Sequence, residues 1–178
     1  MLKHISLAAA LGALIAVPAL AQSIPPMETS ASAGEKATAT LFTEDSVGDV
    51  QLGMLGLQKG HNAALRAFAR AMVRDHTRTA NEGLHVAQQL GAEDVQLKAG
   101  DENQVELSHL ARYSGAAFDR EFASAMIDAH KTEIGTAQHA LEFTMSPALR
   151  AYLRATLAVD RRHLAMAQAA QQQVGTGD

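Results

Sequence analysis

The stretch from residue 65 to residue 87 reads LRAFARAMVRDHTRTANEGLHVA. At about 100° per residue, one face of a helix through this stretch is almost wholly small or apolar. That face consists of Leu65, Ala69, Met72, Val73, His76, Ala80, Gly83 and Ala87. An apolar stripe of this length is typical of a helix that packs against other helices. His76 lies within the stripe, so we expect its imidazole to face the core.

Two later segments repeat this pattern, and each also places one histidine on its apolar face. The first stripe is Ala116, Asp119, Ala123, Met126, Ile127, His130, Ile134, Ala137 and Leu141, and the second is Leu149, Tyr152, Thr156, Val159, His163, Ala167 and Ala170. Each inward histidine lies about fifteen to seventeen residues from the turn that bounds its segment. Antiparallel packing would therefore bring the three imidazoles to within about two helical turns of height. His85 and His139 lie on the opposite, polar faces, and we expect both to be solvated.

Capping and turn residues divide the chain into five helical segments. Thr43 is a candidate N-cap for the first, with Phe42 and Val47 as a hydrophobic staple, and Pro147 is suited to the first position of the last. The expected helices span about 44–59, 62–91, 102–112, 115–144 and 146–173. No stretch alternates with period two between turn residues, so no strand is expected. The pattern predicts an all-α fold, a four-helix bundle with a short extra helical segment between helices 2 and 3.

The N-terminus has the pattern of a secretory signal peptide. A basic Lys3 precedes an apolar run over 5–17, and small residues stand at Ala19 and Ala21. We therefore expect a signal peptide over 1–21, a flexible leader rich in Ser, Thr, Ala and Pro over 22–40, a bundle domain over 41–174 and a disordered tail over 175–178. On this interpretation the mature chain has no transmembrane segment, and the protein is expected to be periplasmic or secreted.

Composition narrows the classes of partner. The 178 residues include no cysteine, so disulfides, thiolate metal ligands and a lipidated cysteine are excluded. The formal charge is −4 and the basic residues form no patch. With two tyrosines, five phenylalanines and no tryptophan, the chain also lacks aromatic platforms for bases. Nucleic acid is therefore not an expected partner.

Carboxylates accompany the inward histidines on the same stripes. Asp119 is in line with His130, Glu133 lies one turn beyond His130, and Asp160 lies one turn before His163. On the first helix, Asp49 shares a face with a row of glycines. Helical bundles build metal sites from such inward carboxylates and imidazoles. The predicted metal-ligating residues are His76, His130, His163, Asp49, Asp119 and Glu133.

The identity of the metal stays open at this point. The order His130-x-x-Glu133 reverses the Glu-x-x-His pattern of diiron bundles, and Glu82-x-x-His85 has the right order on the wrong face. Met72 and Met126 each lie four residues before an inward histidine. Thioether with imidazole would suit Cu, whereas imidazole with carboxylate suits Zn, Fe or Mn. Methionines also fill gaps in alanine-rich cores, which is the simpler interpretation.

A second interpretation needs no metal. Each inward imidazole can be neutral, hydrogen-bonded to an inward acid, and serve to define helix register. The protein would then be a non-enzymatic envelope or stress protein that binds another envelope protein or a second copy of itself. Asp75, at the edge of its helix, fits a surface salt bridge with Arg74 or Arg78. Hydrolysis is disfavoured because no Gly-x-Ser-x-Gly occurs.

Several stretches carry a family resemblance. These are DVQLGMLGLQKG at 49–60, LRAFARAMVRDHTRTANEGL at 65–84, AAFDREFASAMIDAH at 116–130, and the late His163. Over about 42–170 the chain resembles the bacterial exported family called domain of unknown function 4142, which is grouped with ferritin-like bundles. The resemblance implies a ferritin-like four-helix fold and an envelope location, and it supplies no established reaction. This chain has Asp49 where the family commonly has Glu.

Overall fold

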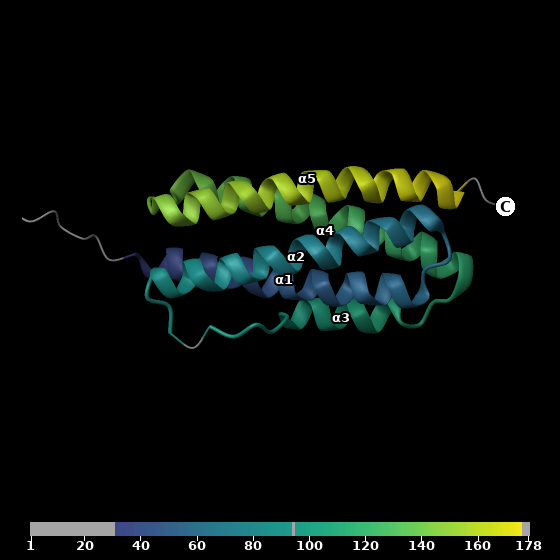
Figure 1. Cartoon of the computed structure of the whole chain (residues 1–178), viewed down its shortest axis with the longest axis horizontal. Coiled ribbons are helices and arrows are strands. Elements are labelled where there is room, and N and C mark those ends of the chain that lie inside the picture. Colours follow the sequence, from purple (N-terminus) through teal and green to yellow (C-terminus); the bar gives the residue numbers. More distant parts are fainter. Residues whose placement is uncertain (1–30, 94, 176–178) are drawn as a thin grey trace, which may run out of the picture.

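The computed structural model describes residues 31–93 and 95–175 and contains five helices within them. The helices are α1 (Ala33–Lys59), α2 (Ala63–Gln89), α3 (Asp101–Leu110), α4 (Gly115–Phe143) and α5 (Pro147–Gly175). No strand occurs among the described residues. Four long helices run side by side, and the short α3 lies along one side of them (Figure 1). The all-α four-helix bundle with an extra segment between its second and third long helices is confirmed.

The bundle is built from two antiparallel hairpins. α1 packs along α2, and α4 packs along α5. The two hairpins meet mainly where α2 lies against α5, while α1 and α4 touch at only a few places. α3 covers part of α1 and reaches α4 (Figure 1). The polar site lies within the layer where the two hairpins face each other.

Two glycines allow α1 to approach its neighbours closely. A Cβ atom on Gly53 would lie 2.9 Å from Cγ2 of Val73, and one on Gly56 would lie 2.7 Å from Cζ of Phe122. Both distances are too short for ordinary packing, so larger side chains there would force the helices apart. The phenylalanines Phe68, Phe118 and Phe122 are among the largest fully buried side chains and pack together with leucines and methionines at this end of the core.

The helix boundaries agree with the sequence within about two residues, except at the start of α1. α1 begins at Ala33 rather than residue 44, because Ser32 and Glu35 form a capping box. Thr43, expected to be the N-cap, instead lies inside the helix and donates its hydroxyl to the carbonyl of Ala39 at 2.7 Å. Ala39 is fully buried, so this first part of the helix is held by packing as well as by its cap.

The expected flexible leader is therefore wrong for residues 33–40, which are helical. The Glu35 carboxylate also accepts the backbone N–H groups of Met145 and Ser146, which ties the start of α1 to the α4–α5 connection. The expected signal peptide, the first residues of the leader and most of the expected tail lie outside the described residues. Within the described ranges, no helix has both the length and the hydropathy that a membrane span requires.

Asp119, on α4, holds the connection between α1 and α2. Its carboxylate accepts the N–H of Asn62 at 2.7 Å and the N–H of His61 at 3.0 Å. The Asn62 side chain in turn caps α2 by accepting from Ala64 and Leu65. One buried carboxylate thus attaches the first hairpin to the second.

Replacing Asp119 with alanine tests this structural role. We expect Asp119→Ala to lower the free energy of unfolding by about 2–3 kcal/mol, because two part-buried N–H groups lose a charged acceptor. Urea unfolding measures the change, with the exposed Asp128→Asn on the same helix as the control. Unchanged stability together with loss of bound metal would show instead that Asp119 is a ligand.

Candidate metal centre

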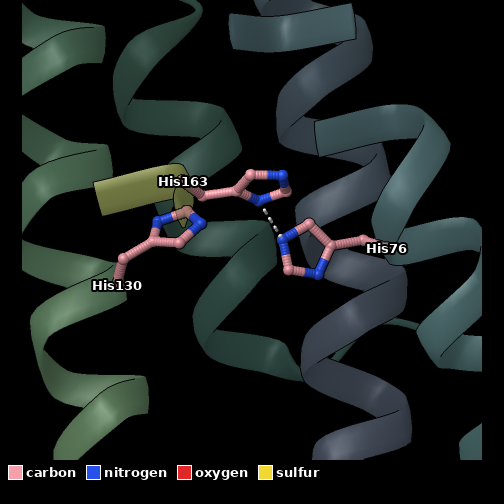
Figure 2. A group of neighbouring side chains, drawn as sticks. All are labelled: His76, His130 and His163. Atoms are coloured by element: carbon pink, nitrogen blue, oxygen red, sulfur yellow. Dashed lines mark hydrogen bonds between the residues drawn. The ribbon is translucent and has the colours of Figure 1, made fainter. Parts of the chain in front are cut away.

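Three buried imidazoles from three helices meet in the middle of the bundle. His76 of α2, His130 of α4 and His163 of α5 are at most 1% exposed. Their ring centroids are 4.8 Å apart for His76 and His163, 5.7 Å for His76 and His130, and 5.5 Å for His130 and His163. One donor nitrogen from each ring lies within 4.8 Å of the others. Figure 2 shows the three rings facing a common space.

Asp75 determines the tautomer of His163. Its Oδ2 lies 3.1 Å from Nε2 of His163 and 2.7 Å from Nη2 of Arg162, and Arg74 forms two further bonds of 2.9 Å to the same carboxylate. Burial alone would raise the pKa of Asp75, but hydrogen bonds from Arg74, His163 and Arg162 hold it well below its usual range. An ionised carboxylate can only accept, so Nε2 of His163 carries the proton and Nδ1 carries the lone pair.

His76 continues this hydrogen-bonded chain. Its Nε2 lies 3.0 Å from Nδ1 of His163, the bond drawn in Figure 2. Because His163 Nδ1 is an acceptor, His76 Nε2 is the donor in the metal-free protein. The other nitrogen, Nδ1, faces Oδ2 of Asp49 at 3.4 Å. Burial raises the pKa of Asp49 and lowers that of His76, so the two face each other as neutral groups rather than as an ion pair.

His130 presents a free lone pair to the same space. Its Nδ1–H donates to the carbonyl of Met126 at 2.8 Å, which leaves Nε2 as the acceptor nitrogen. This Nε2 is buried and has no hydrogen-bond partner among the described residues. A buried polar atom without a partner costs free energy and calls for an explanation.

The donor set fits a metal ion. Metal-ligating histidines usually bind the ion through one nitrogen and donate the other N–H to a carboxylate or carbonyl. His163 has Asp75 in this role, and His130 has the Met126 carbonyl. His76 would have Asp49 once its proton moved from Nε2 to Nδ1. Burial also lowers the pKa of both His130 and His163 to about 4, which keeps them neutral at pH 7, as ligation requires.

A carboxylate group adjoins the imidazoles. Donor atoms of Asp49, His130 and Glu133 lie within 4.8 Å of one another. Burial raises the pKa of Glu133 to about 7, and that of Asp160 to about 8 with a further contribution from Glu133. Burial, together with the charge of Glu133, raises the pKa of Asp45 to about 7. Among the described residues, no hydrogen bond reaches Oδ1 of Asp49, Oε2 of Glu133 or either carboxylate oxygen of Asp160.

Five of the six residues predicted as metal ligands lie together. The structure brings His76, His130, His163, Asp49 and Glu133 into two adjoining groups. It does not bring Asp119 there, because that carboxylate is held by the backbone of the α1–α2 connection. Met72 and Met126 are fully buried and pack in the apolar cluster, which agrees with the simpler interpretation of the methionines.

Sequence reasoning missed the roles of Asp75 and Asp45. Asp75 does bind Arg74, as expected, but it is 3% exposed and also binds His163. The sequence does contain a signal for the role of Asp75. Asp75 directly precedes His76 and Arg162 directly precedes His163, so a helix register that brings the two histidines together also brings Asp75 to Arg162. A helix starting at residue 44 would place Asp45 in an exposed first turn. In the structure α1 begins at Ala33, so Asp45 lies well inside the helix and is half-buried.

The raised carboxyl pKa values predict how pH affects the metal-free protein. A carboxyl whose pKa is higher in the folded than in the unfolded state stabilises the fold at low pH, and this stabilisation is lost as pH rises through the folded value. The imidazoles, whose pKa values are lowered by folding, change the stability of the fold only below about pH 6.5. We therefore expect the melting temperature in chelator to fall between about pH 6.5 and 8.5, and to fall less steeply in Asp160→Asn. A flat or rising profile would contradict these carboxyl pKa values, and Asp128→Asn is the exposed control.

Comparisons with known proteins agree with this fold. No curated protein matches the sequence. Among solved structures, the chain is similar to "CopM in the Cu(II)-bound form", with a TM-score of 0.66 and 21% identity over 78% of this chain and 96% of that chain. At this identity the likeness shows a shared fold. The model of one protein family matches residues 21–170. Because this match spans most of the chain, including every residue of the site, the protein belongs to the family described as Domain of unknown function (DUF4142).

Proposed function

We propose that this protein is an exported periplasmic protein that binds a transition-metal ion through His76, His130 and His163. The observation that carries the proposal is the buried Nε2 of His130, which has no partner among the described residues and lies among donor nitrogens of two other neutral imidazoles. A purely structural histidine would be expected to use both of its nitrogens. The signal-peptide pattern of residues 1–21 supports export.

Two carboxylates orient the ligands in this proposal. Asp75 accepts the Nε2 proton of His163, and Asp49 faces Nδ1 of His76. These contacts hold the rings so that their remaining nitrogens converge. Glu133, which adjoins Asp49 and His130, adds negative charge next to the site when it is ionised. Such charge would favour a divalent ion.

Imidazole donors suit copper, zinc and iron better than manganese. Copper is the first ion to test, since the similar solved structure is described as a Cu(II)-bound form. The three imidazoles are almost wholly shielded from solvent, so the site would hold an ion away from water and other molecules. We infer a role in storing or sequestering metal, which would serve the cell under metal or oxidative stress.

A second candidate function rests on the hydrogen bonds from Asp75 through His163 to His76. These hydrogen bonds form without a metal, and their role could be only to define the register of α2 and α5. The protein would then act in the envelope by binding a partner or a second copy of itself. The exposed Phe143 and Met145, near the end of α4, are apolar side chains available to such a contact.

Removing one imidazole separates the two functions. We expect the wild-type protein to bind about one equivalent of Cu²⁺ or Zn²⁺ at this site, and to gain about 4 kcal/mol of stability at a free concentration of about 1,000 Kd. His130→Ala should lose both the bound ion and the gain. Elemental analysis and thermal unfolding measure them, with the exposed His139→Ala on the same helix as the control. Equal metal content in all three proteins, or a wild type that cannot be loaded, would favour the structural role.

The orienting role of Asp75 has its own test. We expect Asp75→Asn to weaken metal affinity by about 10–100-fold while the stoichiometry is kept, since the side chain no longer carries the charge that fixes the His163 tautomer. Competition with a chelator of known affinity measures the change. The control is Glu82→Gln, an exposed carboxylate on the same helix. Unaltered affinity in Asp75→Asn would show that Asp75 is only a partner of the two arginines.

A further inference from the structure

A cleft with a volume of about 670 Å³ opens between α1, α3 and α4. Two of its walls, α1 and α4, contact each other at only a few places. Seven carboxylates line it, and the lining includes no lysine or arginine among the described residues. The acidic residues are Asp45, Asp49, Glu102, Glu106, Glu121, Asp128 and Glu133. Such a concentration of like charge is unfavourable unless protons or cations compensate it.

α3 forms one wall of this cleft. It lies beside α1 (Figure 1), and Asn103 packs directly on Gly48. A Cβ atom on residue 48 would overlap the Asn103 side chain, so the missing side chain of Gly48 allows α3 to lie this close. α3 carries Glu102 and Glu106 into the lining, opposite Glu121 and Asp128 of α4. The short extra helix thus turns a gap between two long helices into an acidic cleft.

The inner end of the cleft holds carboxylate oxygens without partners among the described residues. Asp49 is only 2% exposed, and no hydrogen bond from these residues reaches its Oδ1. No hydrogen bond from these residues reaches Oε2 of Glu133 either, and one carboxylate oxygen of Glu133 lies within 4.8 Å of one of Asp49. Asp45 lines the cleft one helical turn from Asp49. Buried oxygens of this kind are usually hydrogen-bonded or bound to a metal ion.

We propose that Asp45, Asp49 and Glu133 form a second cation site at the inner end of this cleft, which takes a divalent ion that prefers oxygen ligands, such as Mn²⁺. Carboxylates with some retained water are the donors that such ions prefer. The site goes beyond the proposed function, because none of the three imidazole nitrogens that would hold the first ion is needed for it. The cleft gives it a route to solvent that the enclosed imidazoles lack.

Asp49 connects the two sites. Its Oδ2 faces Nδ1 of His76, whereas its Oδ1 is the oxygen without a partner among the described residues. One carboxylate can therefore orient an imidazole with one oxygen and bind a cation with the other. Glu102 and Glu106, the two acids that α3 adds to the lining, are not among the proposed ligands. Their charge raises the local cation concentration and speeds entry at low ionic strength.

Mn²⁺ is the probe for this site, used with the folded protein after its imidazoles have been loaded with Zn²⁺. The electron paramagnetic resonance signal of free Mn²⁺ reports how much is bound. We expect about one equivalent in the wild type. Glu133→Gln and Asp45→Asn should each weaken Mn²⁺ binding by more than about tenfold, since loss of a ligand exceeds loss of an outer contact. The control Glu142→Gln, an exposed carboxylate on the same helix as Glu133, should bind as the wild type does.

Each outcome has a distinct meaning. Retention of Mn²⁺ in His163→Ala, with loss in Glu133→Gln, supports a separate carboxylate site. If Mn²⁺ does not bind the wild type, or binds equally in Glu133→Gln and the control, the second site is overturned and the imidazole site stands. The second site is also overturned if a single ion is lost in both His163→Ala and Glu133→Gln, since that describes one mixed site. If His163→Ala keeps its Zn²⁺ while the carboxylate variants lose Mn²⁺, the proposed imidazole site fails and this one stands.

Discussion

The hydrogen bonds that run from Asp75 through His163 to His76 constrain the rest of this bundle. They join α2 to α5 at mid-height, and both the tautomers and the ring orientations depend on them. A shift of one residue in either helix would rotate a histidine by about 100° and move it out of the core. It would also separate Asp75 from Arg162 and leave a buried carboxylate short of donors. The same register of α2 and α5 is therefore needed both to neutralise the buried carboxylate and to keep the imidazoles together.

Around this constraint the two hairpins differ in what they contribute. The α1–α2 hairpin is closed tightly by glycines, and Asp119 attaches its turn to α4. The opposite side, between α1 and α4, is left open and lined by acids. Carboxyls such as Asp160, buried without a partner among the described residues, weaken a metal-free bundle. A cation bound nearby would offset the cost of their desolvation.

Most of the architecture was predictable because it depends on local rules. Gly91 has a φ of 75°, as expected of a residue that ends a helix, and Pro147 opens α5. The composition of residues 22–40 predicts a flexible leader, but the capping box of Ser32 and Glu35 starts α1 within it. The early start of α1 also places Asp45 inside the helix rather than in its first turn. Asp119 was misplaced because a residue on the apolar stripe can still lie too near the helix end to reach the middle.

The sequence by itself determined the helices, their inward faces and the level of the three imidazoles, since helical periodicity and capping act over a few residues. Only the tertiary structure decided which side chains meet. Helix rotation and hairpin pairing are long-range quantities, and they set Asp75 against His163, Asp49 between His76 and Glu133, and α3 over the gap beside α1. The Nε2 of His130 has no partner among the described residues, and it becomes isolated only in the folded chain because burial removes its access to water.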